Sequence, residues 1–454
     1  CLVHRSARIL RNTMSSVSSI TGFKTPSFEA FLDSRDEPGW LKDHRRAAWR
    51  SFESLPMPSR TDEEWMRTDI RLLRLNQFAP PVAGLSSQPF PEFVEPSLTE
   101  DVRFAATTAA LDSRPFVEGH RLAESLAKRG VLFGSLDELV RSHGDLIQRY
   151  LFRAVDATYD KFAALHAAFW SGGAVLYVPR GVVIEEPFHI LSAISPGGSD
   201  FGHILVILDE GADATLLSET AGGGPSSAGL HCGGIELFVG PGAKLRYVNL
   251  QNWGHGVWHF AHQKGLVDRD GALQWTIGAL GSRLAKVNQH VALVGPGADT
   301  QVNGVMFTEG KQHLAYHTLQ HHEAPSCHSD LLYKGALQDK SRLVWRGMIK
   351  VDQGAQKTDG YQRNDNLMLS EEARADSIPG LEIEADDVRC THGATTGRVD
   401  DEQIFYCRTR GLTRKESIRT VVTGFFQQVF DRITIESVRD ALGEAIGRRV
   451  REFE

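Results

Sequence analysis

A short unit built around a Gly-Ala pair recurs through the middle of the chain and constrains its fold more than any other feature. In each unit a few apolar or polar residues precede the pair and a strand-like run follows it, as in VGPGAKLRYV (239–248) and VGPGADTQVN (294–303). Glycine supplies the turn conformation, and recurrence at such intervals indicates a repeat architecture whose coils stack on one another. The Gly-Ala pairs begin at residues 211, 242, 271, 297, 335 and 354.

The recurring units divide the chain into a repeat region with different segments on either side. Residues 171–405 predict a β-helix or similar β-solenoid, although a β-sandwich with hairpin glycines would give a comparable spacing of glycines. Helical periodicity predicts an N-terminal helical region over residues 26–170, which includes a Pro- and Ser-rich linker at 76–95. Residues 406–454 predict a C-terminal helical region, and residues 1–25 a disordered leader.

Two capping boxes mark expected helix starts, Thr61 with Glu64 and Thr413 with Glu416. Apolar residues at helical spacing follow the second box and form one broad stripe. This stripe is typical of a helix that packs on the body of the chain or docks a partner, and the pattern alone favours packing. The stripe comprises Ile418, Val421, Val422, Phe425, Phe426, Val429 and Phe430, and a second helix is expected from Val438, Leu442, Ile446 and Val450.

Composition excludes several classes of function. With 50 Lys and Arg against 57 Asp and Glu, the net charge of −7 argues against nonspecific nucleic-acid binding. No apolar run approaches the roughly 20 residues of a membrane span. Five sparse cysteines indicate reduced thiols in a cytoplasmic protein rather than a disulfide framework. The basic leader lacks the apolar core of a secretory signal, so we expect a gene-model extension before a start at Met14, or a short organellar transit peptide.

The segment HLAYHTLQHHEAPSCHSD carries the densest set of metal-ligand side chains. Because it lies among the repeats, we predict a strand, in which residues on one face are spread along the strand at about 3.3 Å per residue. That spread favours a polar face of stacked strands over one metal site. The residues concerned are His313, His317, His321, His322, Cys327 and His328.

Cys390 and His392 are separated by one residue, so in a strand their side chains point to the same side. A neighbouring imidazolium would favour the thiolate, which is the form that binds metal. Two ligands do not complete a tetrahedral site, which leaves a site completed by a second polypeptide or a buried thiol beside a satisfied histidine. Cys407 could supply a third ligand, but Phe405 and Tyr406 beside it indicate a core strand. No nucleotide-binding P-loop, G-x-S-x-G or H-E-x-x-H motif is present.

Several long segments together resemble the SufB/SufD family of iron–sulfur cluster assembly scaffolds, over about residues 26–450. They include YDKFAALHAAFWSGGAVLYVPRGVVIEEP, VNLQNWGHGVWHF, WRGMIKVDQGAQKTDGYQRNDNLMLSEEARADSIP and GLEIEADDVRCTHGATTGRVDDEQIFYCRTRGL. SufB-type members carry an acidic E-H-E-like triplet where this chain has Cys390-Thr391-His392. They also carry a cysteine where this chain has Asn364. Both departures favour the SufD branch.

The resemblance implies a mainly β fold, a right-handed parallel β-helix core flanked by N-terminal and C-terminal helical regions. It implies a non-catalytic cytoplasmic scaffold that pairs with SufB as a heterodimer and meets sulfur donor proteins indirectly. ATP would be bound by the partner ATPase SufC and not by this chain, and a transient iron–sulfur cluster would be shared with SufB. By resemblance, His392 is the better cluster ligand and Cys390 the second. The implied SufC-docking residues are Ile418, Val422, Phe425, Phe426 and Val429.

Two alternatives stay open at this point. One is a SufB-like scaffold that forms homodimers. The other is a β-helix enzyme acting on polysaccharides, although the chain lacks an export signal and an obvious cluster of aspartates on its repeats.

Overall fold

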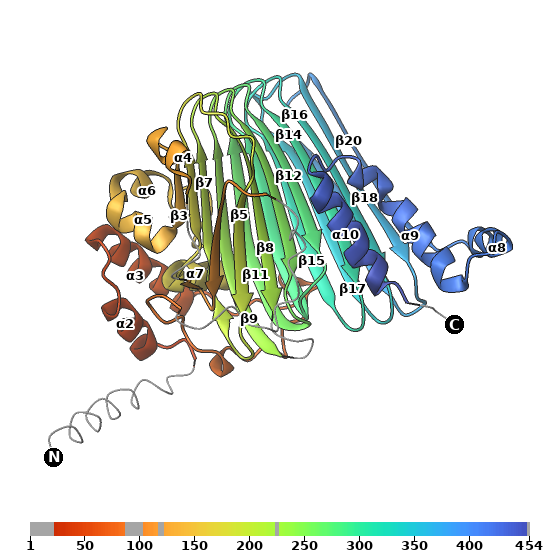
Figure 1. Cartoon of the computed structure of the whole chain (residues 1–454), viewed down its shortest axis with the longest axis horizontal. Helices are drawn as coiled ribbons and strands as arrows, with labels where there is room; N and C mark the ends of the chain where they lie inside the picture. The colour runs from red at the N-terminus through yellow and green to blue at the C-terminus, as the bar shows by residue number, and fades with distance from the viewer. Residues whose placement is uncertain (1–21, 87–102, 117–121, 223–226, 452–454) are drawn as a thin grey trace, which may run out of the picture.

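The computed structural model describes residues 22–86, 103–116, 122–222 and 227–451. The predicted leader lies almost wholly outside these residues, as does much of the predicted linker. The described chain forms a long parallel β-solenoid with helices at both ends (Figure 1). The fold class predicted from the sequence is confirmed.

The solenoid consists of two sheets, and successive strands alternate between them so that each coil adds one strand to each sheet. Nearly all neighbouring strands are parallel. The first sheet contains β2 (Arg114–Pro115), β1 (Ala106–Leu111), β5 (Phe188–Ile194), β8 (Asp213–Gly222), β10 (Lys244–Asn252), β12 (Ala272–Ala279), β14 (Asp299–Thr308), β16 (His328–Leu337), β18 (Thr358–Met368) and β20 (Val388–Arg398). The second contains β3 (Leu132–Ser135), β4 (Ala174–Val178), β7 (His203–Leu208), β9 (Ala228–Val239), β11 (Gly256–Val267), β13 (Leu284–Leu293), β15 (His313–His322), β17 (Arg342–Val351) and β19 (Arg374–Ile383), with β6 (Ser199–Asp200) beside β9.

A residue with a left-handed backbone stands at one corner of successive coils. Its N–H donates to a carbonyl of the following coil, for example from Gly211 to Pro241 (2.9 Å) and from Gly242 to Arg269 (2.8 Å). The recurrence predicted from the sequence therefore corresponds to turns that stack on one another, but glycine occupies only four of the seven corners described. The corner residues are Gly181, Gly211, Gly242, Asp270, Gly297, Ser326 and Lys357, with φ between 55° and 73°.

The interior of the solenoid is a continuous ladder of apolar and aromatic side chains. Large rings from successive coils stand in the core with almost no exposed surface, and their burial holds one coil on the next. These rings belong to Tyr247, Trp275, Tyr316, Tyr333 and Trp345.

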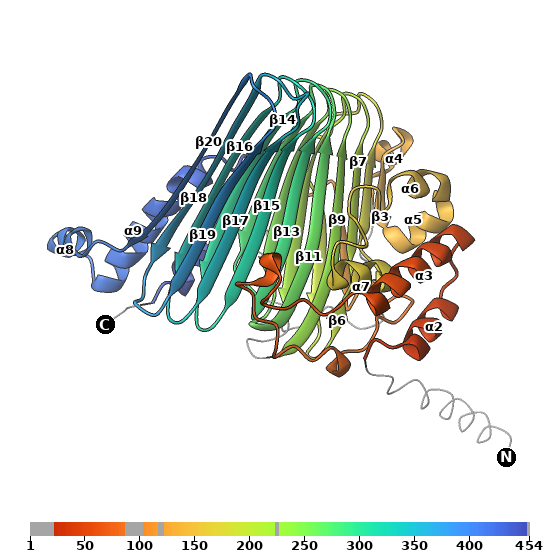
Figure 2. The ribbon, with the colours of Figure 1, turned by 180° about the vertical axis from the view of Figure 1, so that it is seen from behind.

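Helices pack around the N-terminal end of the solenoid (Figure 2). They are α2 (Thr25–Asp33), α3 (Gly39–Ser54), α4 (Glu124–Lys128), α5 (Leu136–Ser142), α6 (Gly144–Tyr150) and α7 (Lys161–Phe169). The short 3₁₀ turns η1 (Glu63–Trp65) and η2 (Leu75–Gln77) follow α3, and η1 contacts β15 and β17 further along the solenoid. The predicted capping box at Thr61 is wrong. The η1 turn begins after Asp62 without a side-chain cap, because the Glu64 carboxylate is bound to the solenoid instead.

The C-terminal helices are α8 (Asp401–Thr409), α9 (Arg414–Phe430) and α10 (Glu436–Arg449). The capping box of α9 is confirmed: the Glu416 N–H donates to the Thr413 hydroxyl (3.2 Å), and the Thr413 N–H donates to the Glu416 carboxylate (2.8 Å). Helix α9 lies on β14 and β16 of the first sheet, with α10 alongside it (Figure 1). The core strand predicted around Cys407 is wrong, because this residue belongs to α8.

Candidate functional site

The last coil of the solenoid, formed by β19 and β20, ends without a further coil over it (Figure 2). Within the described residues, β19 pairs only with β17 and β20 pairs only with β18. Each therefore presents one edge of unpaired backbone N–H and C=O groups, which is a template for another strand. Leu381 (38% exposed) and Ile383 (40% exposed) add apolar surface to the same coil.

Cys390 and His392 both lie on β20, the outermost strand of this coil. Cys390 stands opposite Gly360 and His392 opposite Gln362 of β18. Cys390 is half-buried against a small apolar cluster that includes Ile349, while His392 is exposed. The spacing of two places their side chains on one side of the strand.

The Cys390 thiol is not activated within this chain. Burial raises its pKa, and the nearby Asp359 carboxylate acts in the same direction, although a backbone hydrogen bond from Gly360 opposes both. The groups that shift this pKa do not include His392. The expectation that a neighbouring imidazolium favours the thiolate therefore stays a prediction. A metal ion bound at this thiol would displace its proton.

Asn364, two residues along β18 from Gln362, is fully buried below this coil. Its amide oxygen accepts from Asn366 (2.7 Å) and from the Ser377 hydroxyl (2.5 Å), and its nitrogen donates to the Tyr333 carbonyl (3.3 Å). This position therefore carries a buried, hydrogen-bonded amide instead of a metal-binding thiol. Across the described part of the chain, no three His, Cys, Asp or Glu side chains group closely enough to hold a metal ion.

The histidines of residues 313–328 lie along β15 and β16, as the strand prediction required. Each of four has its own separate partner. His317 contacts Glu64 (2.8 Å), His321 contacts Asp352 (2.9 Å), His322 contacts Ser329 (2.8 Å) and His328 contacts Asp299 (2.8 Å). The side chains serve separate polar contacts and do not converge on one point.

The structure buries most of the side chains assigned to ATPase docking. Ile418, Val422, Phe426 and Val429 are at most 2% exposed, because they pack on the first sheet and on α10. Only Phe425 is partly buried, and its ring lies beneath the Lys334 ammonium group at 4.8 Å. The stripe is therefore an internal packing face, and it does not form an exposed docking surface.

The exposed side of the same helices has features that the sequence pattern did not single out. A shallow groove of about 930 Å³ runs between α9 and α10 and includes Arg419, Gln427 and Arg439. Helix α8, which precedes α9 in the chain, carries two aromatic residues at the surface, Phe405 (69% exposed) and Tyr406 (60% exposed). The sequence DDEQIFYCRT places polar residues on every face of a helix, and this pattern could have predicted that the two rings are exposed.

Comparison with known families identifies the class to which this fold belongs. The sequence model described as "SUF system FeS cluster assembly, SufBD core domain" matches residues 190–425, more than half of the chain. The model of the "SufBD protein N-terminal region" matches residues 29–190. The chain therefore belongs to the SufBD family of iron–sulfur cluster assembly proteins.

Individual relatives narrow this assignment. The chain is 28% identical to the iron–sulfur cluster assembly protein SufD of Bacillus subtilis over 433 residues, covering 93% of this chain and 97% of the relative. It is 27% identical to SufBD family proteins of Staphylococcus saprophyticus and Staphylococcus epidermidis over 414 residues, 88% of each chain. It is thus a homologue of SufD. No helix in the described segments has the length and apolar character needed to cross a membrane.

Proposed function

We propose that this chain is a SufD-type scaffold subunit that pairs with SufB through its last coil and supplies ligands to a nascent iron–sulfur cluster. The observation that carries the proposal is the uncovered end of the solenoid. There, two unpaired strand edges, exposed apolar residues and the pair Cys390 and His392 occur together. A second β-helix with a matching end would cover all of them at once.

The chemistry of the two side chains fits this role. Thiolate and imidazole are ligands that iron accepts, and iron–sulfur clusters are held by such groups. Two ligands from this chain leave coordination positions for groups from SufB. Cys390 would bind iron as the thiolate, so metal binding at this side chain would release its proton.

Docking of the ATPase SufC is proposed at the exposed side of the C-terminal helices. The groove between α9 and α10 and the aromatic residues of α8 provide surface there, while the buried stripe joins α9 firmly to β14 and β16. SufC would bind ATP, and the closing of the SufC subunits would be transmitted to the solenoid through α9. We also propose a cytoplasmic location, where free thiols such as Cys232, Cys327, Cys390 and Cys407 persist.

Co-expression with SufB tests the pairing surface. Ile383→Asp places a charge at the proposed interface, so we expect loss of co-elution with SufB on size exclusion. Val294→Asp is the matched control, because Val294 is 39% exposed and lies at a solenoid corner away from the last coil. Retained pairing in Ile383→Asp would contradict the proposal.

The same uncovered coil favours one second candidate, a homodimeric scaffold in which another copy of this chain takes the place of SufB. The mass of the purified chain alone, and then with SufB added, separates the two. A stable dimer that SufB does not dissociate would support the homodimer. Membership in an assembly family favours either scaffold over the polysaccharide-active alternative.

A further inference from the structure

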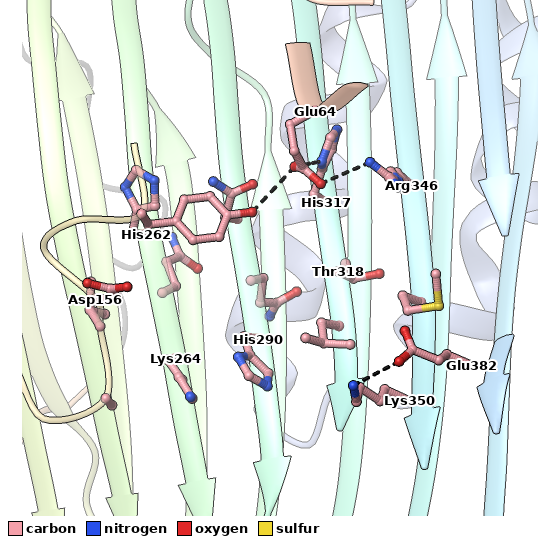
Figure 3. Close-up of a pocket in the computed structure, with 18 residues that line it drawn as sticks. Glu64, Asp156, His262, Lys264, His290, His317, Thr318, Arg346, Lys350 and Glu382 are labelled. Atoms are coloured by element: carbon pink, nitrogen blue, oxygen red, sulfur yellow. Dashed lines mark hydrogen bonds and ion pairs between the residues drawn. The ribbon is translucent and has the colours of Figure 1, made fainter. Parts of the chain in front are cut away.

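A pocket of about 390 Å³ opens on the outer surface of the second sheet (Figure 3). Its floor consists of outward-facing side chains of β11, β13, β15 and β17. The η1 turn and the segment before α7 form its walls. A volume of this size lies within the range of small-molecule sites.

The floor is an ordered grid because the strands are parallel and in register. Lys264, His290, Leu319 and Met348 stand side by side on successive strands. Adjacent strands are about 4.8 Å apart. At this interval the polar side chains of Lys264 and His290 are followed by the apolar side chains of Leu319 and Met348. Asn288 lies two residues before His290 and points to the same outer side.

The carboxylates that line the pocket already have partners. Glu64 is bound by His317 (2.8 Å) and Arg346 (2.9 Å) at one end of the pocket. Asp156 accepts from the Thr158 backbone N–H (2.7 Å). Glu382 pairs with Lys350 (2.8 Å), but both are substantially exposed, so this pair holds Lys350 only weakly.

Several other groups in the pocket lack a partner within the described protein. Both polar atoms of the Asn288 amide and the Nε2 atom of His290 are buried without a hydrogen bond. Lys264 is half-buried and forms no ion pair with any described carboxylate. Buried groups left in this state are costly, and they mark places where a bound molecule would be stabilised.

His290 contributes hydrogen bonding to the pocket and not charge. Burial lowers its pKa to about 3, and the Lys264 ammonium adds to this effect. At neutral pH the imidazole is therefore uncharged, and the unpaired positive charge in the pocket is that of Lys264, with Lys350 available on the other side of the floor.

We propose that this pocket binds a small organic anion whose carboxylate or phosphate group meets Lys264. An uncharged hydrogen-bonding group on the same molecule meets Asn288 and His290, and its apolar body lies on Leu319 and Met348. The pocket includes neither Cys390 nor His392, and it reaches the last coil only at Glu382 of β19. The inference therefore does not depend on the proposed scaffold function.

Ligand-observed NMR titration of the full chain at low ionic strength tests this site with two pairs of probes. Adenosine 5′-monophosphate and nicotinate carry the two kinds of anion on a heteroaromatic body, and adenosine and nicotinamide are their uncharged counterparts. We expect saturable binding of at least one anion, and about tenfold weaker binding of its uncharged counterpart.

Variants of the floor complete the test. Lys264→Met is expected to weaken binding of the anion about tenfold. Asn288→Leu should weaken both the anion and its uncharged counterpart. Lys244→Met, at an exposed lysine of the first sheet, is the control and should bind as the wild type does. Failure of both anions to bind at millimolar concentration, or equal weakening by Lys264→Met and Lys244→Met, would overturn the proposal.

Discussion

Replacing Phe426 by alanine distinguishes packing from docking on α9. The ring is fully buried, and its centroid lies 5.2 Å from that of Phe425 and 5.8 Å from that of Phe430. Truncation removes the transfer free energy of the ring and leaves a cavity, which together cost about 3–5 kcal/mol. We therefore expect Phe426→Ala to lower the free energy of unfolding of the C-terminal helices by about this amount.

This loss of stability is measured by urea unfolding, with hydrogen exchange of the α9 and α10 backbone amides as the readout. Phe405→Ala is the matched control, because its ring is 69% exposed and its removal should change stability by no more than about 0.5 kcal/mol. If Phe426→Ala is as stable as Phe405→Ala, the stripe does not pack as described. Its apolar residues would then be available to a partner, as the sequence resemblance implied.

Three further predictions concern the corners, the η1 contact and the thiol. Gly242→Ala, at a corner with φ of 64°, should lower stability by about 1–2 kcal/mol in urea unfolding, whereas Gly354→Ala, at a turn without positive φ, should be near neutral; equal effects would contradict the corner account. Burial opposes ionisation of Glu64, but its hydrogen bond to His317 and nearby cations outweigh burial and hold its pKa near 2. A lowered pKa stabilises the fold above the unfolded value of 4.5, and the effect is lost as the pH falls towards 2. Glu64→Gln should thus lower the free energy of unfolding by roughly 1 kcal/mol or less at pH 7, since the Glu64 side chain is 39% exposed. This loss of stability should shrink below pH 4.5, and a loss that does not depend on pH would refute the reasoning. Alkylation of Cys390 by iodoacetamide should be slow at pH 8 and rise beyond pH 9, and a profile centred at or below 9 would contradict the raised pKa.

The β-helix could be predicted from its turns, although the pattern that revealed it was incomplete. Three of the six Gly-Ala pairs mark true corners, at Gly211, Gly242 and Gly297. The corner that precedes β16 holds Ser326 in the same conformation, whereas Gly335 lies inside that strand. Sequence repeats reveal a glycine but not an occasional serine, aspartate or lysine that adopts the same backbone, so the coil length could not be counted.

The interface residues could be placed on a strand, but their surroundings could not be predicted. Two-residue spacing indicates one face for Cys390 and His392, which the register on β18 supports. The protonation of the thiol depends on burial by residues distant in sequence, such as Ile349, and no local pattern contains that information.

Pairing between distant segments also explains what was missed at Glu64. The sequence DEEW suggested a helix start, whereas the carboxylate binds His317, more than two hundred residues later. Likewise, an apolar stripe on α9 does not disclose whether sheet or partner covers it. The pocket on the second sheet was not predicted from the sequence, because only the register between strands aligns Lys264 with His290.

Bound iron and sulfide in the complex with SufB and SufC, purified without oxygen, test the central claim most directly. His392→Ala should assemble normally and lose iron and sulfide, because it removes a proposed cluster ligand at the interface. His328→Ala, a similarly exposed histidine on β16, should retain both. Equal iron and sulfide in wild type and His392→Ala would contradict the claim and leave this chain a purely structural subunit.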